Sequence, residues 1–195
     1  MTSVRCRIVP YALLVLVAVA GAVSFVLANR SMVVERPSLG GPLPQPRRQV
    51  NLVGRTAPAF TAVDLQGRAA GTAALRGRVV VLSVWATWCP PCVEELPRVE
   101  REIWQRFRPD VAVVAVARKE DAAKVRAFNQ RAKLTFALVE DPRGSISRRF
   151  GGDDSIPRTY VIDRSGVIVH QTIGYGDQSF ADLVAAVDRA VAQRR

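Results

Sequence analysis

Residues 79–92 read Val-Val-Val-Leu-Ser-Val-Trp-Ala-Thr-Trp-Cys-Pro-Pro-Cys, and this stretch decides the fold. Its first six residues form an almost continuous β-branched apolar run, which predicts a strand covered on both faces. The residues from Pro90 onward predict a helix, because proline stands at the first helical position and apolar residues follow at helical spacing. We therefore expect Cys89 just before a helix N-terminus and Cys92 one turn further on.

Two cysteines at this spacing can close a disulfide. The unpaired N–H groups and the positive end of the helix dipole favour a thiolate at Cys89. We expect Cys89 to be an exposed nucleophile and Cys92 a shielded thiol that resolves the mixed disulfide. Half a zinc site has the same spacing, but the only other cysteine is Cys6 and the only histidine is His170. Four zinc ligands are not easily assembled from that set, so no metal is expected. A plain structural disulfide stays an alternative.

The rest of the chain divides into four segments. Residues 8–28 carry no charge over a length that spans a bilayer, which predicts a transmembrane anchor. Basic residues before it place residues 1–7 in the cytoplasm and the remainder outside. A cleaved signal peptide is the alternative. Residues 29–53 are rich in Pro and Gly and predict a semi-rigid linker, and residues 54–195 form the folded domain.

The domain alternates strand and helix patterns, which predicts an α/β fold with a mixed sheet and helices on both of its faces. The helix after Pro90 should be kinked or broken near Pro97. Besides the strand at 79–85, we expect strands at 110–117, 134–139, 158–162 and 167–173, and helices at 90–106, 121–132, 144–150 and 179–192.

The formal net charge of the chain is +11. In the folded domain both signs are mixed, and there is no block of like charge and no basic stripe interleaved with aromatic residues. This pattern speaks against nucleic acid as a partner. A basic face remains compatible with an acidic partner or an anionic lipid surface.

The segment 85–92, with Glu95 and Pro97 after it, resembles the membrane-anchored, thioredoxin-like thiol–disulfide oxidoreductases of the bacterial cell envelope, the TlpA/ResA/DsbE (CcmG) group. The resemblance covers nearly the whole folded domain and implies a thioredoxin-like fold. The other matching segments are 54–60, 65–67, 75–77 and 155–163.

The resemblance implies that Cys89 and Cys92 are the catalytic dithiol, with no cofactor beyond their disulfide. It also implies that Glu95 tunes the thiols and moves protons, whereas spacing alone leaves a solvated helix acid equally open. Ser83 departs from ordinary thioredoxins, which carry a buried aspartate six residues before the first cysteine. The departure puts more weight on Glu95.

The resemblance assigns substrate contacts to five further residues. Trp88, Pro90 and Pro91 would flank the reactive sulfur. Pro157 would be cis, although few X–Pro bonds are, and the Ile156 backbone could then pair with an extended substrate.

The implied activity is reduction of protein disulfides outside the cytoplasm, in apocytochrome c haem-attachment motifs or in copper-oxidase assembly. Electrons would come from a membrane dithiol carrier of the CcdA or DsbD type. Two alternatives stay open. A peroxiredoxin-like thiol peroxidase shares the patterns at residues 57–60 and 65–67. Its threonine stands three residues before the cysteine, however, and Thr87 is two before Cys89. A Sco-type copper-delivery protein has C-x-x-x-C, one residue longer than here.

Overall fold

The computed structural model describes residues 19–20, 24, 50–151 and 155–193. The chain divides into two compact units, Met1–Pro46 and Arg47–Arg195. Among the described residues, no helix is long and apolar enough to cross a membrane. The cytoplasmic segment, the anchor and the linker predicted before residue 54 lie outside the described residues, except for the helical positions 19, 20 and 24 and the last residues of the linker.

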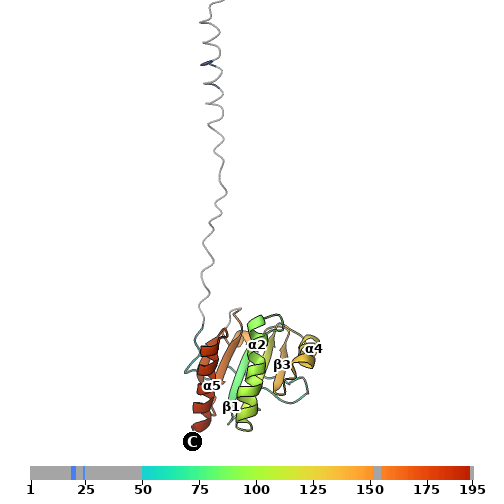
Figure 1. Ribbon diagram of the computed structural model, residues 1–195, viewed down its shortest axis with the longest axis vertical. Coiled ribbons are helices and arrows are strands. Elements are labelled where there is room, and N and C mark those ends of the chain that lie inside the picture. Colours follow the sequence, from blue (N-terminus) through green and yellow to red (C-terminus); the bar gives the residue numbers. More distant parts are fainter. Residues whose placement is uncertain (1–18, 21–23, 25–49, 152–154, 194–195) are drawn as a thin grey trace, which may run out of the picture. The chain divides into compact units, whose positions relative to one another are not determined.

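The second unit is built around a five-stranded mixed sheet, whose strands lie in the order β3-β2-β1-β4-β5 (Figure 1). The central strand pairs parallel with β2 and antiparallel with β4. All its residues are buried, as its β-branched run predicted. The bounds are Val79–Trp85 for β1, Val111–Arg118 for β2, Ala137–Asp141 for β3, Arg158–Ile162 for β4 and Ile168–Ile173 for β5.

Figure 1 shows α2 and α5 lying in front of the sheet, over one of its faces. The predicted helix at 90–106 is divided into three pieces: α2 ends at Arg98, a π-helix follows, and α3 closes the segment. The break follows Pro97, whose missing N–H removes a bond from the helical ladder. The bounds are Pro90–Arg98 for α2, Val99–Trp104 for η1, Gln105–Phe107 for α3, Ala122–Ala132 for α4, Ser147–Arg149 for the 3₁₀ helix η2 and Asp177–Ala192 for α5.

The two faces of the sheet are covered differently. Buried residues of α2, η1, α4 and α5 share one core cluster with Val79, Val81 and Trp85 of β1. The opposite cluster contains Val80 and Leu82 of β1 and is covered by parts of segments 52–75 and 146–150. Among the described residues the second face therefore carries one short helix, the 3₁₀ helix η2, which lies within the helix predicted at 144–150. The prediction of helices on both faces holds there only for this single turn. The segments that cover this face are broken by turns too often to form longer helices.

Candidate active site

The two cysteines of the C-x-x-C motif are joined by a disulfide at the point where β1 leads into α2. The Sγ atoms are 2.09 Å apart and the Cα atoms 5.3 Å apart. Cys89 is the N-cap of α2 in an extended conformation, and Cys92 lies in its first turn. The structure thus brings both predicted redox residues together at the C-terminal end of the central strand.

The exposure of Cys89 differs from the sequence-based expectation. Only 3% of Cys89 is exposed and 0% of Cys92. Both residues belong to the helix-covered core cluster. The prediction of an openly exposed nucleophile is wrong for the disulfide form, because the bond to Cys92 holds the Cys89 side chain against the first turn of α2.

The first turn of α2 also offers fewer backbone donors than expected. Pro90 and Pro91 have no N–H. The next two N–H groups, of Cys92 and Val93, both donate to the Cys89 carbonyl oxygen, at 3.0 and 3.1 Å. No amide of this turn is therefore left over for the Cys89 sulfur. The helix dipole alone remains to favour a thiolate, and it is a weak effect.

Glu95 is not a solvated helix acid. Only 2% of the residue is exposed. Its Oε1 lies 2.8 Å from Thr159 Oγ1, and its Oε2 has no hydrogen-bond partner among the described residues. Burial raises the pKa of Glu95 to about 7, against the smaller, lowering effect of the Thr159 hydrogen bond. The carboxyl group can therefore hold or release a proton near neutral pH.

Glu95, Thr159 and Ser83 form a chain of hydrogen-bonded polar side chains that runs across the sheet. Ser83 and Thr159 are paired residues of β1 and β4, and their hydroxyl oxygens lie 3.1 Å apart. Both side chains are buried. Three polar groups thus run from β1 through β4 to α2 inside an apolar core. From the sequence, Ser83 was noted only because ordinary thioredoxins have an aspartate at that position. In the structure, Thr159 connects Ser83 to the carboxyl group of Glu95 by hydrogen bonds.

The predicted substrate-contact residues lie around this centre. Trp88 is 62% exposed, Pro90 is exposed and Pro91 half-buried. The Ile156–Pro157 bond is cis, as the resemblance implied. Ile156 packs against the core cluster that contains both cysteines. The segment with the cis bond continues directly into β4, and so into Thr159.

A second buried carboxylate holds the turn before the cysteines. Thr87 donates its N–H to Glu120 Oε2 at 2.8 Å and its hydroxyl to Glu120 Oε1 at 2.6 Å. Glu120 is 2% exposed and follows the end of β2. Glu120 was not predicted from the sequence as a site residue. Its signal is an acid placed just after a strand that runs parallel to β1, since such strands end at the same edge of the sheet.

His170 lies on β5, which is separated from β1 by β4. In the part of the chain that the structure describes, no three His, Cys, Asp or Glu side chains come together as ligands for a metal. The reactive group that the described residues assemble is the disulfide.

Comparisons with known proteins show which proteins this chain is similar to. Residues 53–171 match the AhpC/TSA family. A thioredoxin-like protein of Bacillus subtilis, YneN, is 35% identical over 138 residues, which are 69% of this chain and 78% of the relative. The thiol-disulfide oxidoreductase ResA of Geobacillus thermodenitrificans is 35% identical over 117 residues, 60% of this chain and 66% of the relative.

Two solved structures show the same fold. A putative protein disulfide isomerase from Bacteroides thetaiotaomicron is 33% identical with a TM-score of 0.70, covering 74% of this chain and 93% of that one. A putative thiol:disulfide interchange protein DsbE from Chlorobium tepidum is 26% identical with a TM-score of 0.66, covering 71% and 97%.

Proposed function

We propose a function for a chain that belongs to the AhpC/TSA family and is a thioredoxin-like thiol–disulfide oxidoreductase. On this premise, it reduces protein disulfides with Cys89 and Cys92. The observation that carries the proposal is the Cys89–Cys92 disulfide at the start of α2, within one buried core with Glu95. A disulfide that was only structural would not need a buried ionisable group with a near-neutral pKa three residues after it on the same helix.

The reaction has two steps. The Cys89 thiolate attacks one sulfur of the substrate disulfide, a mixed disulfide forms, and the other substrate sulfur leaves as a thiolate. Cys92 then loses its proton and attacks Cys89 Sγ, which releases the second substrate sulfur. The protein ends with the Cys89–Cys92 disulfide, and the substrate gains two electrons and two protons. Glu95 would accept a proton from Cys92 and supply one to a leaving sulfur.

The direction of transfer follows from the stability of the thiolate. A strongly stabilised thiolate favours the dithiol form and makes the disulfide an oxidant, as in DsbA. With prolines at the first two helical positions, α2 withholds amide donors from Cys89. A buried carboxylate further disfavours a second negative charge. Both features support a reductant.

We further propose a setting for this activity. The domain would be tethered by residues 8–28 to the bacterial inner membrane and would work outside the cytoplasm. Its substrates would be disulfides of apocytochrome c or of copper-site assembly proteins, and a CcdA- or DsbD-type carrier would reduce it. The support is the resemblance of segments 85–97 and 155–163 and the uncharged run before the domain.

The test is to trap the mixed disulfide in the native host. In Cys92→Ala the second step is blocked, so substrates should stay linked to Cys89 and be identified after non-reducing purification. The Cys89→Ala/Cys92→Ala variant is the matched control and should capture nothing. Absence of any Cys89-linked protein would refute the proposal. Turnover of hydrogen peroxide at a rate above disulfide reduction would favour the thiol peroxidase instead.

A further inference from the structure

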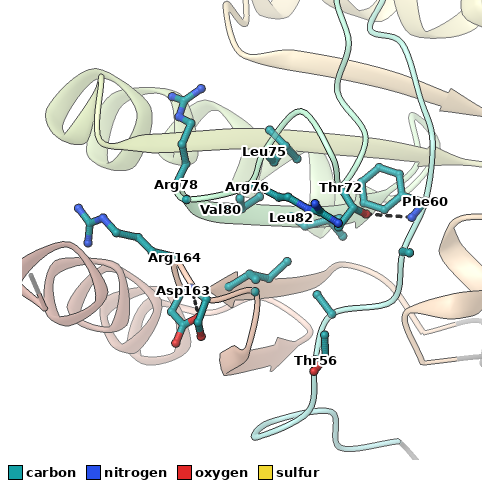
Figure 2. A pocket seen from close by; sticks show the side chains of 16 residues that line it. Thr56, Phe60, Thr72, Leu75, Arg76, Arg78, Val80, Leu82, Asp163 and Arg164 are labelled. Atoms are coloured by element: carbon teal, nitrogen blue, oxygen red, sulfur yellow. Dashed lines mark hydrogen bonds between the residues drawn. The ribbon is translucent and has the colours of Figure 1, made fainter. Parts of the chain in front are cut away.

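A cavity of about 290 Å³ lies away from the disulfide (Figure 2). Its floor includes Val80 and Leu82, which belong to the core cluster on the face opposite the cysteines. Segments 56–60, 72–78 and 162–166 supply the other lining residues. None of the residues assigned to disulfide exchange lines it, so the cavity is separate from the site of that reaction.

The cavity combines an apolar floor with a basic rim. Val80, Leu82, Ile162, Leu75 and Phe60 present aliphatic and aromatic surface. The rim carries three arginines, at positions 76, 78 and 164. Concave, mostly apolar sites with a few placed polar groups are the usual form of small-molecule sites.

Arg76 is the arginine available to a ligand. It is exposed, and no described residue makes a hydrogen bond or ion pair with its side chain. Figure 2 shows this side chain running along the cavity toward Thr72 and Phe60. An unpaired guanidinium beside an apolar floor can accept an anionic head group with two parallel hydrogen bonds.

The two other arginines are fixed but only weakly neutralised. Arg78 donates to the carbonyl oxygens of Pro109 and Val111, at 3.0 and 2.9 Å. Arg164 donates to the carbonyl oxygen of Ala190 at 2.9 Å, and its ion pair with Asp110 is long, at 3.8 Å. Carbonyl oxygens carry no full negative charge, although those that bind Arg164 lie at the negative C-terminal end of α5. Part of the positive charge therefore remains at the rim.

Asp163 is the one acid among the described lining residues. Its Oδ1 accepts hydrogen bonds from the N–H and hydroxyl of Ser165, at 2.9 and 2.6 Å, and from the N–H of Val167 at 2.9 Å. The carboxylate is thus used by its own turn. Three arginines and one aspartate thus line this cavity, which leaves an excess of positive charge.

We propose that this cavity binds a small amphiphilic anion, with its apolar part on the Val80–Leu82 floor and its carboxylate at Arg76. The volume is near the lower end of the range of about 300–1,000 Å³ for ligand sites. It therefore fits a single ring or a short aliphatic chain better than a two-chain lipid. The proposal is independent of the direction and substrate of disulfide exchange.

The probe is 4-ethylbenzoate, titrated calorimetrically into the full chain in lipid nanodiscs, with empty nanodiscs as the blank. We expect saturable binding of one molecule per chain, with 4-ethylbenzyl alcohol and 4-ethylbenzylamine binding at least about tenfold more weakly, the scale of one charge-assisted hydrogen bond. Raising the salt concentration should weaken the binding of 4-ethylbenzoate but not that of the other two probes.

Three variants locate the site. Arg76→Gln should weaken benzoate binding about five- to tenfold, and Arg126→Gln, which removes an exposed arginine on α4, should leave it unchanged. Ala59→Phe places a ring in the cavity mouth and should abolish binding. We expect all three variants to retain disulfide reductase activity, which would show that they are folded. Equal binding of the three probes, no saturable binding, or unchanged affinity in Arg76→Gln or Ala59→Phe would overturn the proposal.

Discussion

Glu95 makes the stability of the domain depend on pH. The unfolded chain has an ordinary glutamate pKa, whereas burial raises the pKa of Glu95 in the fold to about 7. The folded state therefore binds more protons between pH 4.5 and 7. Stability from this group is full below the unfolded pKa and is lost as the pH rises through that window.

We predict that raising the pH from 5 to 8 destabilises the oxidised wild type by roughly 3 kcal/mol relative to Glu95→Gln. The glutamine keeps the shape and has no charge to bury. The measurement is urea unfolding of both proteins at several pH values. Glu94→Gln, one residue earlier and exposed, is the control and should follow the wild type. Parallel pH profiles for wild type and Glu95→Gln would contradict the burial argument.

The same substitution should change the thiols. A carboxylate near a thiolate disfavours the second negative charge, so we predict that the thiol pKa falls in reduced Glu95→Gln. Exchange should nevertheless slow, because a proton carrier is lost. The measurements are thiolate absorbance against pH and the rate of disulfide reduction. Superimposable titrations with unchanged rates would reduce Glu95 to a structural residue.

At the scale of elements, the turn between β1 and α2 is held by the turn after β2. Glu120 accepts both hydrogen bonds of Thr87, and Trp88 follows directly. We predict that Glu120→Ala slows reduction of a protein disulfide about tenfold, the size of one lost charge-assisted hydrogen bond in the bound state. Reduction of a small soluble disulfide, which needs less of the Trp88 surface, should change less.

Glu120→Gln is the conservative partner of that variant. Its amide can accept the Thr87 N–H and donate to the Thr87 hydroxyl, so most of the activity on protein substrates should return. Equal losses on protein and small disulfides would indicate general loosening of the fold rather than a positioned turn.

The prolines of α2 carry an element-scale prediction about potential. Pro91→Ala restores one N–H to the first turn, where it can reach a Cys89 thiolate. We expect a lower Cys89 pKa and a reduction potential higher by roughly 30 mV, the equivalent of about one net hydrogen bond. A glutathione redox titration measures it. Pro97→Ala restores an N–H further along the helix and should leave the potential in place.

Local patterns explain which elements could be predicted. The β-branched run of β1 and the apolar spacing after Pro90 are properties of neighbouring residues, and both elements were found. The polar chain was not, because Thr159 meets Ser83 only once β4 is paired with β1 in one register. Glu120 likewise depends on the parallel register of β2. Pro90 and Pro91 lack an N–H, which the sequence itself shows, so the first turn has fewer free donors for Cys89 than a helix N-terminus ordinarily offers.

At the scale of the molecule, the covering of the second face could not be read from periodicity. Segments 52–75 and 146–150 contribute single buried residues such as Leu52, Ala70 and Phe150, not a repeating stripe. Their positions are set by the sheet they cover. The cavity with Arg76 forms among these segments, so the sequence contained no signal for it.

The balance between the two redox forms is also a property of the whole molecule. A reductant must be more stable oxidised than reduced, whereas an oxidant such as DsbA is more stable reduced. We predict that the oxidised domain is more stable by roughly 2 kcal/mol, the loop-closure contribution of so short a loop. The melting temperature should then be roughly 4–8 °C higher. Calorimetry with and without reductant tests this, and Cys89→Ala/Cys92→Ala should not respond. The reverse order would identify an oxidant.

The hydroxyl of Thr159 has a single hydrogen but two neighbours, Glu95 and Ser83. When Glu95 is ionised, that hydrogen must point to the carboxylate, and the Ser83 hydroxyl can then donate to Thr159. When Glu95 is protonated, it can donate to Thr159, whose hydrogen turns to Ser83. The two hydroxyl rotors thus reverse their polarity with every proton that Glu95 gains or loses. The direction of the two hydroxyl dipoles therefore depends on the protonation state of Glu95. These dipoles lie between β1 and β4, and β4 begins directly after the cis bond.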